Sequence, residues 1–397
     1  MANLELSIMN HSPAASETMR RLLNEFEQHT RNHVNLHILD WEEGKAELTH
    51  YAIYHQGADV SEVATTWAPD LISMNALRPF KQQELARIGR PEDFVSAAWQ
   101  INQPNSASGT CTVPWVSESY MIYYRKDLLQ KAGIAENEAF LSHEHLADTA
   151  QRLAKIGVDI PVELSFNWDQ YGLLHALASW VWGAGVDFCD AEGKQVQLSR
   201  PKVLAVIHAY FGLLKLISPQ GLQTIRENKG NLFIRGLSGI MFSTLYHVTD
   251  TSALAPEVRD NLGAAVMPGG RFVGGSNLAV WKHSRQESAA VELVNFLTAS
   301  STLLQLIEPF RALPCRLDAL AMPQITGDPL LSVYAQSVQS GRSYPQVPLW
   351  GLIEERLYKS LVQIAVNFVD KPDNDLHAAI DQQMQALTRR LNLTLSQ

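Results

Sequence analysis

Strand and helix patterns alternate through the first 67 residues, and this alternation limits the possible folds more than any other feature. The segment LELSIM is a short apolar strand, and Ser12 followed by Pro13 is typical of a helix start. Apolar residues then recur at helical spacing over 19–26, and residues 34–38 alternate as a second strand. With a further helix opening at DWEE and a third strand in GADVSEVATTW, the order predicts an α/β sheet with parallel strands.

Polar and aromatic residues follow each of these predicted strands. Asn10 and His11 come after the first strand, Trp41 after the second and Trp67 after the third. Ligands of open α/β sheets bind outside the carboxyl ends of the strands. The shared position of these four residues is therefore a first indication of a binding site.

The bulk composition indicates a folded protein of two domains. A chain of 397 residues is too long for one average domain, and a hydrophobic content of 46% argues against disorder. The net charge is −9, and the lysines and arginines are scattered. This charge does not favour nucleic acid or an anionic membrane surface as a partner.

Neither a metal site nor a membrane span is predicted. The three cysteines, Cys111, Cys189 and Cys315, lie far apart and are interpreted as buried apolar residues, with a single disulfide left open. His143 and His145 are two residues apart on a predicted helix, so they do not share a face. No apolar run approaches the ~18 residues that span a bilayer. The N-terminus also lacks a basic, apolar secretion signal, so we expect a cytoplasmic protein or one whose targeting segment has been removed.

The tryptophans favour a binding cleft. The chain has nine, and five of them stand at strand ends or next to glycine or proline: Trp41, Trp67, Trp115, Trp182 and Trp350. Core packing explains any single tryptophan. Five at such junctions instead favour a cleft, because indole faces stack on the apolar faces of sugars and on cations.

The segment VPWVSESYMIYYRKDLLQKAGI, residues 113–134, contains the strongest acidic candidate. As a glycosidase residue, Glu118 needs a second carboxylate at about 5–9.5 Å, and no motif marks Asp40, Glu42 or Asp70 as that partner. A hydrogen-bonding role in the wall of a cleft is favoured. Tyr123 and Tyr124 lie in a strand and point to opposite faces, which argues against a shared iron site.

No enzyme motif is present in the rest of the chain. The glycine-rich segments MPGG and VGGSN match neither a Walker A loop nor GxGxxG, and GxSxG is absent. Residue spacing alone therefore predicts no catalytic residues, no metal and no cofactor.

Several blocks together resemble a known family, the extracellular solute-binding proteins of bacterial ABC importers, which includes maltose- and oligosaccharide-binding proteins. VPWVSESYMIYYRKDLLQKAGI is similar to the family's hinge, strand and helix block, and LFIRGLSGIMFSTLY is similar to its Leu-Phe-x-x-Gly-x-Ala-Met block. GAAVMPGG, GGSNLAVWKHS, AAVELVNFLTAS and ALPCR follow in the family's order and spacing. The resemblance covers nearly the whole chain.

The resemblance implies an α/β fold of the periplasmic-binding-protein type (type II). Two α/β lobes would enclose a ligand cleft, and the chain would cross between the lobes several times. The implied N-terminal lobe comprises residues 1–112 and 276–315. The implied C-terminal lobe comprises residues 113–275 and 316–397.

The resemblance, together with the strand-end positions, gives a set of candidate ligand-binding residues. The set is Asn10, His11, Trp41, Trp67, Trp115, Glu118, Tyr120, Trp182, Tyr246, Gly275, Ser276, Asn277, Arg311 and Trp350. This chain departs from the family at two positions. Ala58 replaces a usual proline, and Tyr120 stands where many members have a sugar-binding arginine. The departure at Tyr120 implies an aromatic site with Glu118 as the acceptor.

The resemblance implies a non-enzymatic protein that captures a sugar or oligosaccharide and delivers it to the permease of an ABC transporter. The expected protein is a monomer, periplasmic or extracellular, free or tethered to the membrane, with its export signal removed. Two other functions stay open at this point: a ligand-sensing module of a receptor or kinase, and a glycan-cleaving enzyme. A cationic osmolyte also suits an aromatic cage with a carboxylate.

Overall fold

The computed structural model describes residues 1–100, 109–166, 171–345 and 349–396, and it divides the chain into two α/β units. Unit 1 comprises Met1–Glu118 and Val273–Pro348, and unit 2 comprises Ser119–Phe272 and Leu349–Gln397. The chain therefore passes between the units after Glu118, after Phe272 and after Pro348.

Unit 1 is built on a six-stranded sheet with the order β10-β4-β9-β3-β1-β2. Its strands are β1 (Asn3–Met9), β2 (His33–Leu39), β3 (Val60–Ala64), β4 (Thr112–Ser119), β9 (Val273–Val280) and β10 (Leu313–Pro314). β1 pairs in parallel with both β2 and β3, while β9 is antiparallel to β3 and β10 is antiparallel to β4. The parallel arrangement predicted for the first three strands is confirmed.

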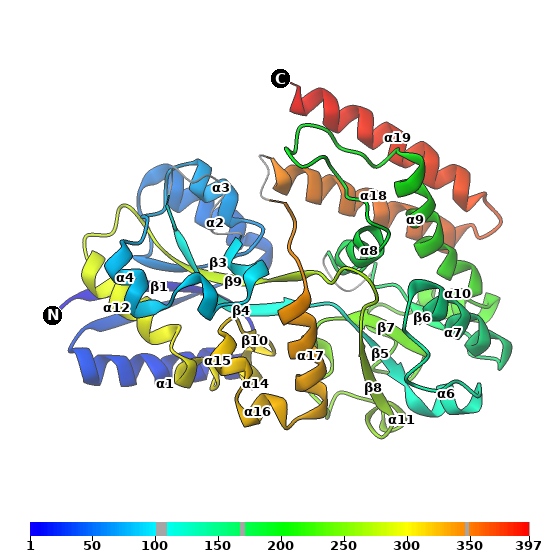
Figure 1. The fold of residues 1–397 in the computed structure, drawn as a ribbon, viewed down its shortest axis with the longest axis horizontal. Coiled ribbons are helices and arrows are strands. Elements are labelled where there is room, and N and C mark those ends of the chain that lie inside the picture. The colour runs from blue at the N-terminus through cyan, green and yellow to red at the C-terminus, as the bar shows by residue number, and fades with distance from the viewer. Residues whose placement is uncertain (101–108, 167–170, 346–348, 397) are drawn as a thin grey trace. The chain divides into compact units, whose positions relative to one another are not determined.

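Helices cover both faces of the unit 1 sheet, with α2 and α3 on one side and α1 on the other (Figure 1). Leu22, Leu23 and Phe26 of α1 are buried, as their helical spacing predicts. Leu48 of α2 and Leu71 of α3 join a core that also contains Trp281. The helices of the unit are α1 (Pro13–Thr30), α2 (Trp41–Tyr54), α3 (Ala68–Ser73), α4 (Gln82–Ile88), η1 (Pro91–Asp93), α5 (Ser96–Gln100), α12 (Glu287–Leu297), α13 (Ser300–Leu303), α14 (Ile307–Phe310), α15 (Leu317–Leu320), α16 (Pro323–Thr326) and α17 (Pro329–Ser340).

Unit 2 has a four-stranded sheet with the order β6-β7-β5-β8. Its strands are β5 (Met121–Arg125), β6 (Val162–Glu163), β7 (Ile240–Ser243) and β8 (Leu262–Val266). β5 is antiparallel to β7 and β8, whereas β6 and β7 are parallel. The helices are α6 (Lys126–Lys131), α7 (His143–Lys155), α8 (Gly172–Gly183), α9 (Pro201–Gly212), η2 (Leu213–Leu216), α10 (Pro219–Glu227), η3 (Leu245–His247), α11 (Pro256–Arg259), α18 (Trp350–Asp370) and α19 (Leu376–Leu395).

The segment after residue 315 differs from the predicted division. The family resemblance implies that residues 316–397 lie together in the C-terminal lobe, but the structure places the chain up to Pro348 in unit 1. Two interactions explain the difference. β10 pairs with β4 just before this segment, and the Ser343 hydroxyl donates to the carbonyl of Val273, so the chain is held against unit 1 strands on both sides of α17.

Within the described ranges, no single helix is both long enough and apolar enough to cross a bilayer. The segments Pro201–Leu216 and Pro219–Glu227 meet the length and hydropathy requirement only as a pair, and they are bent by 96° to each other. The three cysteines are buried and unbridged, which answers the question of a disulfide that the sequence left open.

Candidate functional site

The three parallel strands of unit 1 end at the same edge of the sheet, and predicted site residues follow directly. β1 ends at Met9, β2 at Leu39 and β3 at Ala64. The backbone N–H of Asn10 donates to the carbonyl of Leu39 at 2.8 Å, which fixes the first two strand ends together. The Asn10 side chain is exposed and donates to Asp40 at 3.4 Å.

Two indoles stand beside each other at this edge. Trp41 is the first residue of α2 and Trp67 immediately precedes α3. Their ring centroids lie 5.8 Å apart with an interplanar angle of 63°. Both side chains are half-buried, so each anchors one part in the core and leaves another exposed. Such partly exposed rings are suited to stacking against a ligand.

His11 lies beneath Trp41 and is fixed by a buried carboxylate. Its Nε2 lies 2.9 Å and 3.2 Å from the two carboxylate oxygens of Glu62. Glu62 is fully buried in β3 and also accepts the backbone N–H of Met9 at 2.8 Å. The imidazole packs against Phe310 at 4.3 Å and meets the edge of Trp41 at 5.5 Å. The ring therefore has one defined position.

Two opposing effects set the charge of His11. Burial lowers the pKa of His11, but the charge and hydrogen bond of Glu62, together with the charge of Glu118, outweigh the effect of burial. The pKa of His11 therefore lies above its usual value. An imidazole held in this way keeps its proton at a pH where a free one loses it.

Glu118 lies near the end of β4, is half-buried and is within electrostatic reach of the same pair. Burial raises the pKa of Glu118, the positive charge of His11 lowers it, and the negative charge of Glu62 raises it again, leaving a pKa above the usual value. His11, Glu62 and Glu118 therefore form one group of interacting residues at the strand ends. His11 and Glu118 thus act on each other through their charges.

The start of β9 completes this edge of unit 1. Gly275 has a φ of 118°, and a side chain there would place its Cβ 2.2 Å from the carbonyl oxygen of Val116. Only glycine permits that approach, which brings the two strands close together. The carbonyl of Gly275 accepts the N–H of Thr65, while Ser276 and Asn277 are buried, so their side chains support the edge from within.

One predicted site residue of unit 1 is a core residue. Trp115 has no exposed surface, donates its indole N–H to the carbonyl of Leu297 at 3.1 Å, and meets Phe310 edge to face at 5.1 Å. β4 is buried on both faces, so alternation along it could not show which side chains reach the surface. Trp115 supports Phe310, which in turn packs on His11. Arg311 follows α14 in the left-handed conformation, with a φ of 53°.

The other predicted residues belong to unit 2, where Tyr120 joins an aromatic cluster. Its ring lies 5.5 Å from His175 and 6.2 Å from Phe272. His175 stacks flat on Phe272 at 4.0 Å and also on Tyr171 at 6.0 Å, and Tyr171 packs against Tyr358 at 4.7 Å. These five residues are called the aromatic cluster. Like Arg311, Tyr171 has a positive φ, of 66°, which is uncommon outside glycine and asparagine.

His175 is in the opposite state from His11. Burial lowers the pKa of His175 to about 3. The imidazole is therefore neutral at physiological pH and acts as an aromatic ring.

The three remaining predicted residues lie on other elements of unit 2. Trp182, near the end of α8, is 7% exposed and donates to Asp187 at 3.1 Å. It leaves no room for a side chain at Gly270, whose Cβ would lie 2.5 Å away. Tyr246 in η3 is 37% exposed, while Trp350 at the start of α18 is buried.

Residue spacing missed several members of both sets: Glu62, Phe310, Tyr171, His175, Phe272 and Tyr358. Two of them carried a visible signal. Glu62 interrupts the apolar strand VSEVA, and His175 interrupts the apolar helix GLLHALASW. Acidic residues are almost never fully buried unless they are paired, so Glu62 indicated a buried partner.

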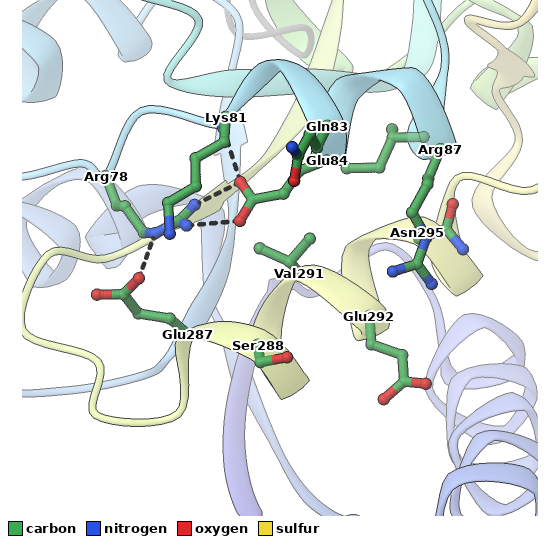
Figure 2. Close-up of a pocket in the computed structure, with 11 residues that line it drawn as sticks. Arg78, Lys81, Gln83, Glu84, Arg87, Glu287, Ser288, Val291, Glu292 and Asn295 are labelled. Carbon is green, nitrogen blue, oxygen red and sulfur yellow. Dashed lines mark hydrogen bonds and ion pairs between the residues drawn. The ribbon is translucent and has the colours of Figure 1, made fainter.

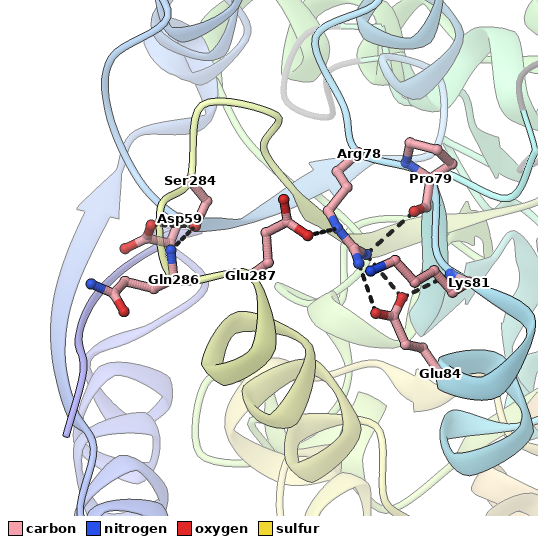
Figure 3. Close-up of polar contacts among 8 residues, drawn as sticks. All are labelled: Asp59, Arg78, Pro79, Lys81, Glu84, Ser284, Gln286 and Glu287. Carbon is pink, nitrogen blue, oxygen red and sulfur yellow. Dashed lines mark hydrogen bonds and ion pairs between the residues drawn. The ribbon is translucent and has the colours of Figure 1, made fainter.

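A separate hollow of about 430 Å³ lies between α4 and α12 of unit 1, away from the strand ends (Figure 2). Arg78 crosses it. Its guanidinium donates to both oxygens of Glu84 at 2.7 Å and 2.9 Å and to Glu287 at 2.9 Å (Figure 3). The Arg78 donors are thus satisfied by carboxylates of the same unit, and the pKa of Glu84 lies below its usual value because of these hydrogen bonds. This arrangement joins α4 to α12 and engages the Arg78 guanidinium within the unit.

Across the described ranges, no group of three or more histidines, cysteines or acidic residues is arranged to hold a metal ion. The chemistry available at the strand ends is therefore hydrogen bonding, ring stacking and charge.

Known solute-binding proteins are similar to this chain in sequence and in fold. The chain is 22% identical over 350 residues to the diacetylchitobiose binding protein DasA of Streptomyces coelicolor, covering 84% of this chain and 77% of the relative. The sugar-binding protein MalE of Xanthomonas citri shares the fold with a TM-score of 0.83 at 19% identity, over 99% of this chain and 97% of that one. A Thermotoga lettingae solute-binding protein bound to α-D-tagatose matches with a TM-score of 0.80 at 15% identity, over the whole of both chains.

These likenesses confirm the predicted periplasmic-binding-protein fold. The family model of bacterial extracellular solute-binding proteins matches residues 11–302. Since that match covers most of the chain, the protein belongs to the bacterial extracellular solute-binding protein family, whose members bind solutes rather than transform them.

Proposed function

We propose that this protein captures a sugar or oligosaccharide and delivers it to the permease of an ABC importer. The observation that carries the proposal is the edge of unit 1, where Asn10, Trp41, Trp67 and Glu118 combine partly exposed indoles with hydrogen-bonding groups. Indole faces pack on the apolar faces of sugar rings, while a carboxylate and an amide bind hydroxyls. DasA and MalE are named for sugar binding and the Thermotoga protein is bound to a sugar, which supports the same ligand class here.

In this proposal the ligand-binding residues have different roles. Trp41 and Trp67 stack on the sugar, and Glu118 accepts its hydroxyls. The peptide groups around Gly275 and the side chain of Asn10 complete the binding surface. Ser276, Asn277 and Arg311 hold this surface in place. Of the candidates in unit 2, Tyr246 is exposed, whereas Tyr120, Trp182 and Trp350 are buried. The protein acts as a monomer in the periplasm or outside the cell, free or tethered to the membrane.

A thermal-shift screen tests the proposal, because a ligand stabilises only the state that binds it. The panel comprises maltose, maltotetraose, diacetylchitobiose, tagatose and mannitol, followed by calorimetry on whichever sugars raise the melting temperature. At about one hundred times the dissociation constant, a sugar should add about 2.7 kcal/mol to the free energy of unfolding. Failure of every sugar to stabilise the protein, or conversion of an oligosaccharide into shorter products, would overturn the proposal.

A cationic osmolyte is a second candidate because of one specific observation. Trp41 and Trp67 stand beside each other, and Trp41 meets His11, the partner of the Glu62 carboxylate. Aromatic cages with acidic neighbours bind quaternary ammonium groups. Glycine betaine in the same screen separates the two ligand classes. Stabilisation by betaine and by no sugar would favour the osmolyte.

A further inference from the structure

We propose that Glu62 is a positioning residue for ligand capture: its buried carboxylate clamps His11 against Trp41, and this clamp sets the angle at which Trp41 and Trp67 meet a sugar. The proposal rests on the proposed function, because it concerns the same pair of indoles. It gives His11 a different role from the one expected from the sequence. The imidazole is buried, so it acts through Trp41 rather than by contact with the sugar.

The carboxylate of Glu62 joins the ends of β1 and β3. The register of these two strands pairs Ser7 with Ser61, the residue before Glu62. One oxygen of Glu62 accepts the backbone N–H of Met9 at 2.8 Å, and the two oxygens lie 2.9 Å and 3.2 Å from Nε2 of His11. A single buried side chain therefore fixes both the backbone that leads to His11 and the imidazole itself.

A row of aromatic rings runs through unit 1 from the core to the strand ends. Trp115 has no exposed surface and meets Phe310 at 5.1 Å, and Phe310 packs on His11 at 4.3 Å. His11 meets Trp41 at 5.5 Å with an interplanar angle of 87°, and Trp41 meets Trp67 at 5.8 Å. The first three rings are buried, whereas the two indoles at the outer end are half-buried. His11 is the middle ring, so its position determines the support beneath the indoles.

The clamp is needed because ring contacts alone do not fix an imidazole. The second side-chain torsion of histidine is broad, so packing leaves the ring several orientations. A hydrogen bond between Nε2 and a carboxylate that is itself held by the backbone selects one of them. A binding surface that is already ordered loses less conformational freedom when the ligand binds, which raises the affinity. Loss of the clamp should therefore weaken binding without removing a group that contacts the sugar.

The helices that carry the indoles are held together independently of this clamp. Lys45 of α2 pairs with Asp70 of α3 at 3.1 Å, and Leu48 and Leu71 of the same two helices lie in one core. Removal of the clamp should therefore change the orientation of the Trp41 ring and leave α2 and α3 in place. The expected change is one of ring angle, which can be measured without a ligand.

Circular dichroism measures the angle between the two indoles. Neighbouring indoles couple and give a pair of bands whose sign and size depend on that angle, and subtraction of the Trp67→Phe spectrum isolates this indole signal from the other tryptophans. In His11→Gln, with the same subtraction made in that background, the indole signal should differ from the wild type. Glutamine can still donate an N–H to Glu62, so the variant keeps the buried carboxylate paired, but it has no ring to support Trp41.

Calorimetry then measures affinity, with whichever of maltose, maltotetraose, diacetylchitobiose, tagatose and mannitol stabilises the protein most. Glu62→Ala and His11→Gln should each weaken binding about tenfold, within the range found for an aromatic anchor. Glu62→Gln should keep both the affinity and the indole signal near their wild-type values. Its amide oxygen can accept the N–H of Met9 while its amide nitrogen donates to the imidazole, so the clamp is preserved without the charge.

Glu163→Ala is the matched control for the loss of a buried carboxylate. Glu163 lies on β6 of unit 2, is 4% exposed and accepts the backbone N–H groups of Leu232 at 2.9 Å and Phe233 at 2.7 Å. The control should lower the melting temperature, as Glu62→Ala does, and leave the indole signal unchanged.

Three results would overturn this inference and leave sugar capture intact. They are an unchanged indole signal in His11→Gln, an equal change of that signal in Glu163→Ala, and a loss of affinity in Glu62→Gln as large as in Glu62→Ala. If Glu62→Ala does not fold, His11→Gln decides the question. If no sugar of the panel binds the wild-type protein, the proposed function fails and this inference fails with it.

Discussion

The two units use histidine in opposite ways. In unit 1, His11 is paired with buried Glu62, and its pKa lies above the usual value. In unit 2, His175 lies flat on Phe272 among tyrosines, and burial lowers its pKa to about 3. Burial lowers the pKa of both side chains, but at His11 the charge and hydrogen bond of Glu62 outweigh that effect. A neighbouring charge can therefore outweigh the effect of burial on a histidine.

The largest expected effect concerns Glu62, the buried carboxylate that pairs with His11. Glu62→Ala removes one partner of a buried pair and leaves both His11 and the N–H of Met9 without their acceptor, so the free energy of unfolding should fall by about 3–5 kcal/mol. Urea unfolding followed by circular dichroism measures it. The exposed pair of Glu5 and His37 provides the control, and Glu5→Ala should cost less than about 1 kcal/mol. Similar losses in the two variants would contradict the account of unit 1.

Ligand binding should depend on the exposed indoles more than on the buried one. Trp67→Ala should weaken sugar binding by about 1–3 kcal/mol, the scale of an aromatic anchor, with little loss of stability. Trp182→Ala in unit 2 should instead lower stability, because its ring packs against Gly270 and its N–H is bonded to Asp187. Calorimetry and thermal unfolding of both variants separate the two effects. A Trp67 variant with unchanged affinity would exclude it from the site.

The neutral histidine of unit 2 should make the protein sensitive to acid. His175 binds a proton in the unfolded chain below pH ~6.5 but in the folded chain only near its lowered pKa, so stability should fall as the pH decreases between these values. His175→Phe keeps the ring and removes the proton site. The variant should therefore recover about 1–2 kcal/mol relative to wild type at pH ~4.5, with little difference at pH ~7.5. An equal pH dependence in both proteins would contradict the neutral state of His175.

The charged histidine of unit 1 should give a smaller effect of opposite sign. The pKa of His11 is raised on folding, so its contribution to stability is present in full below the unfolded pKa of ~6.5 and is lost as the pH rises through the folded pKa. The loss should be about 1 kcal/mol between pH ~6 and pH ~9, and it should be absent in His11→Gln. Urea unfolding at several pH values measures it. A wild-type curve without this alkaline decline would contradict the charged state.

Much of the fold could be predicted because its signals are local. The helical spacing of Leu22, Leu23 and Phe26 and the strand pattern of residues 34–38 need only their own segments, and both elements are present in the structure. The assignment of residues 316–348 could not be made in this way. An amphipathic helix such as α17 shows that it packs on something but not on which sheet, and the pairing of β10 with β4 spans almost two hundred residues of sequence.

The candidate site likewise has residues that could be placed from the sequence and residues that could not. Residues after parallel strands come together by topology, so His11, Trp41 and Trp67 could be placed at one edge from the sequence. Trp115 could not be assigned to the core, because β4 is buried on both faces. The pairing of Glu62 with His11 depends on the register of β1 against β3, which no local pattern encodes.

A structure with a bound oligosaccharide tests the central claim most directly. The account predicts a sugar ring against Trp41 or Trp67 and a sugar hydroxyl within about 3 Å of a Glu118 carboxylate oxygen. A sugar that binds elsewhere, for example in the hollow beside Arg78, and makes no contact with Trp41, Trp67 or Glu118 would contradict the account.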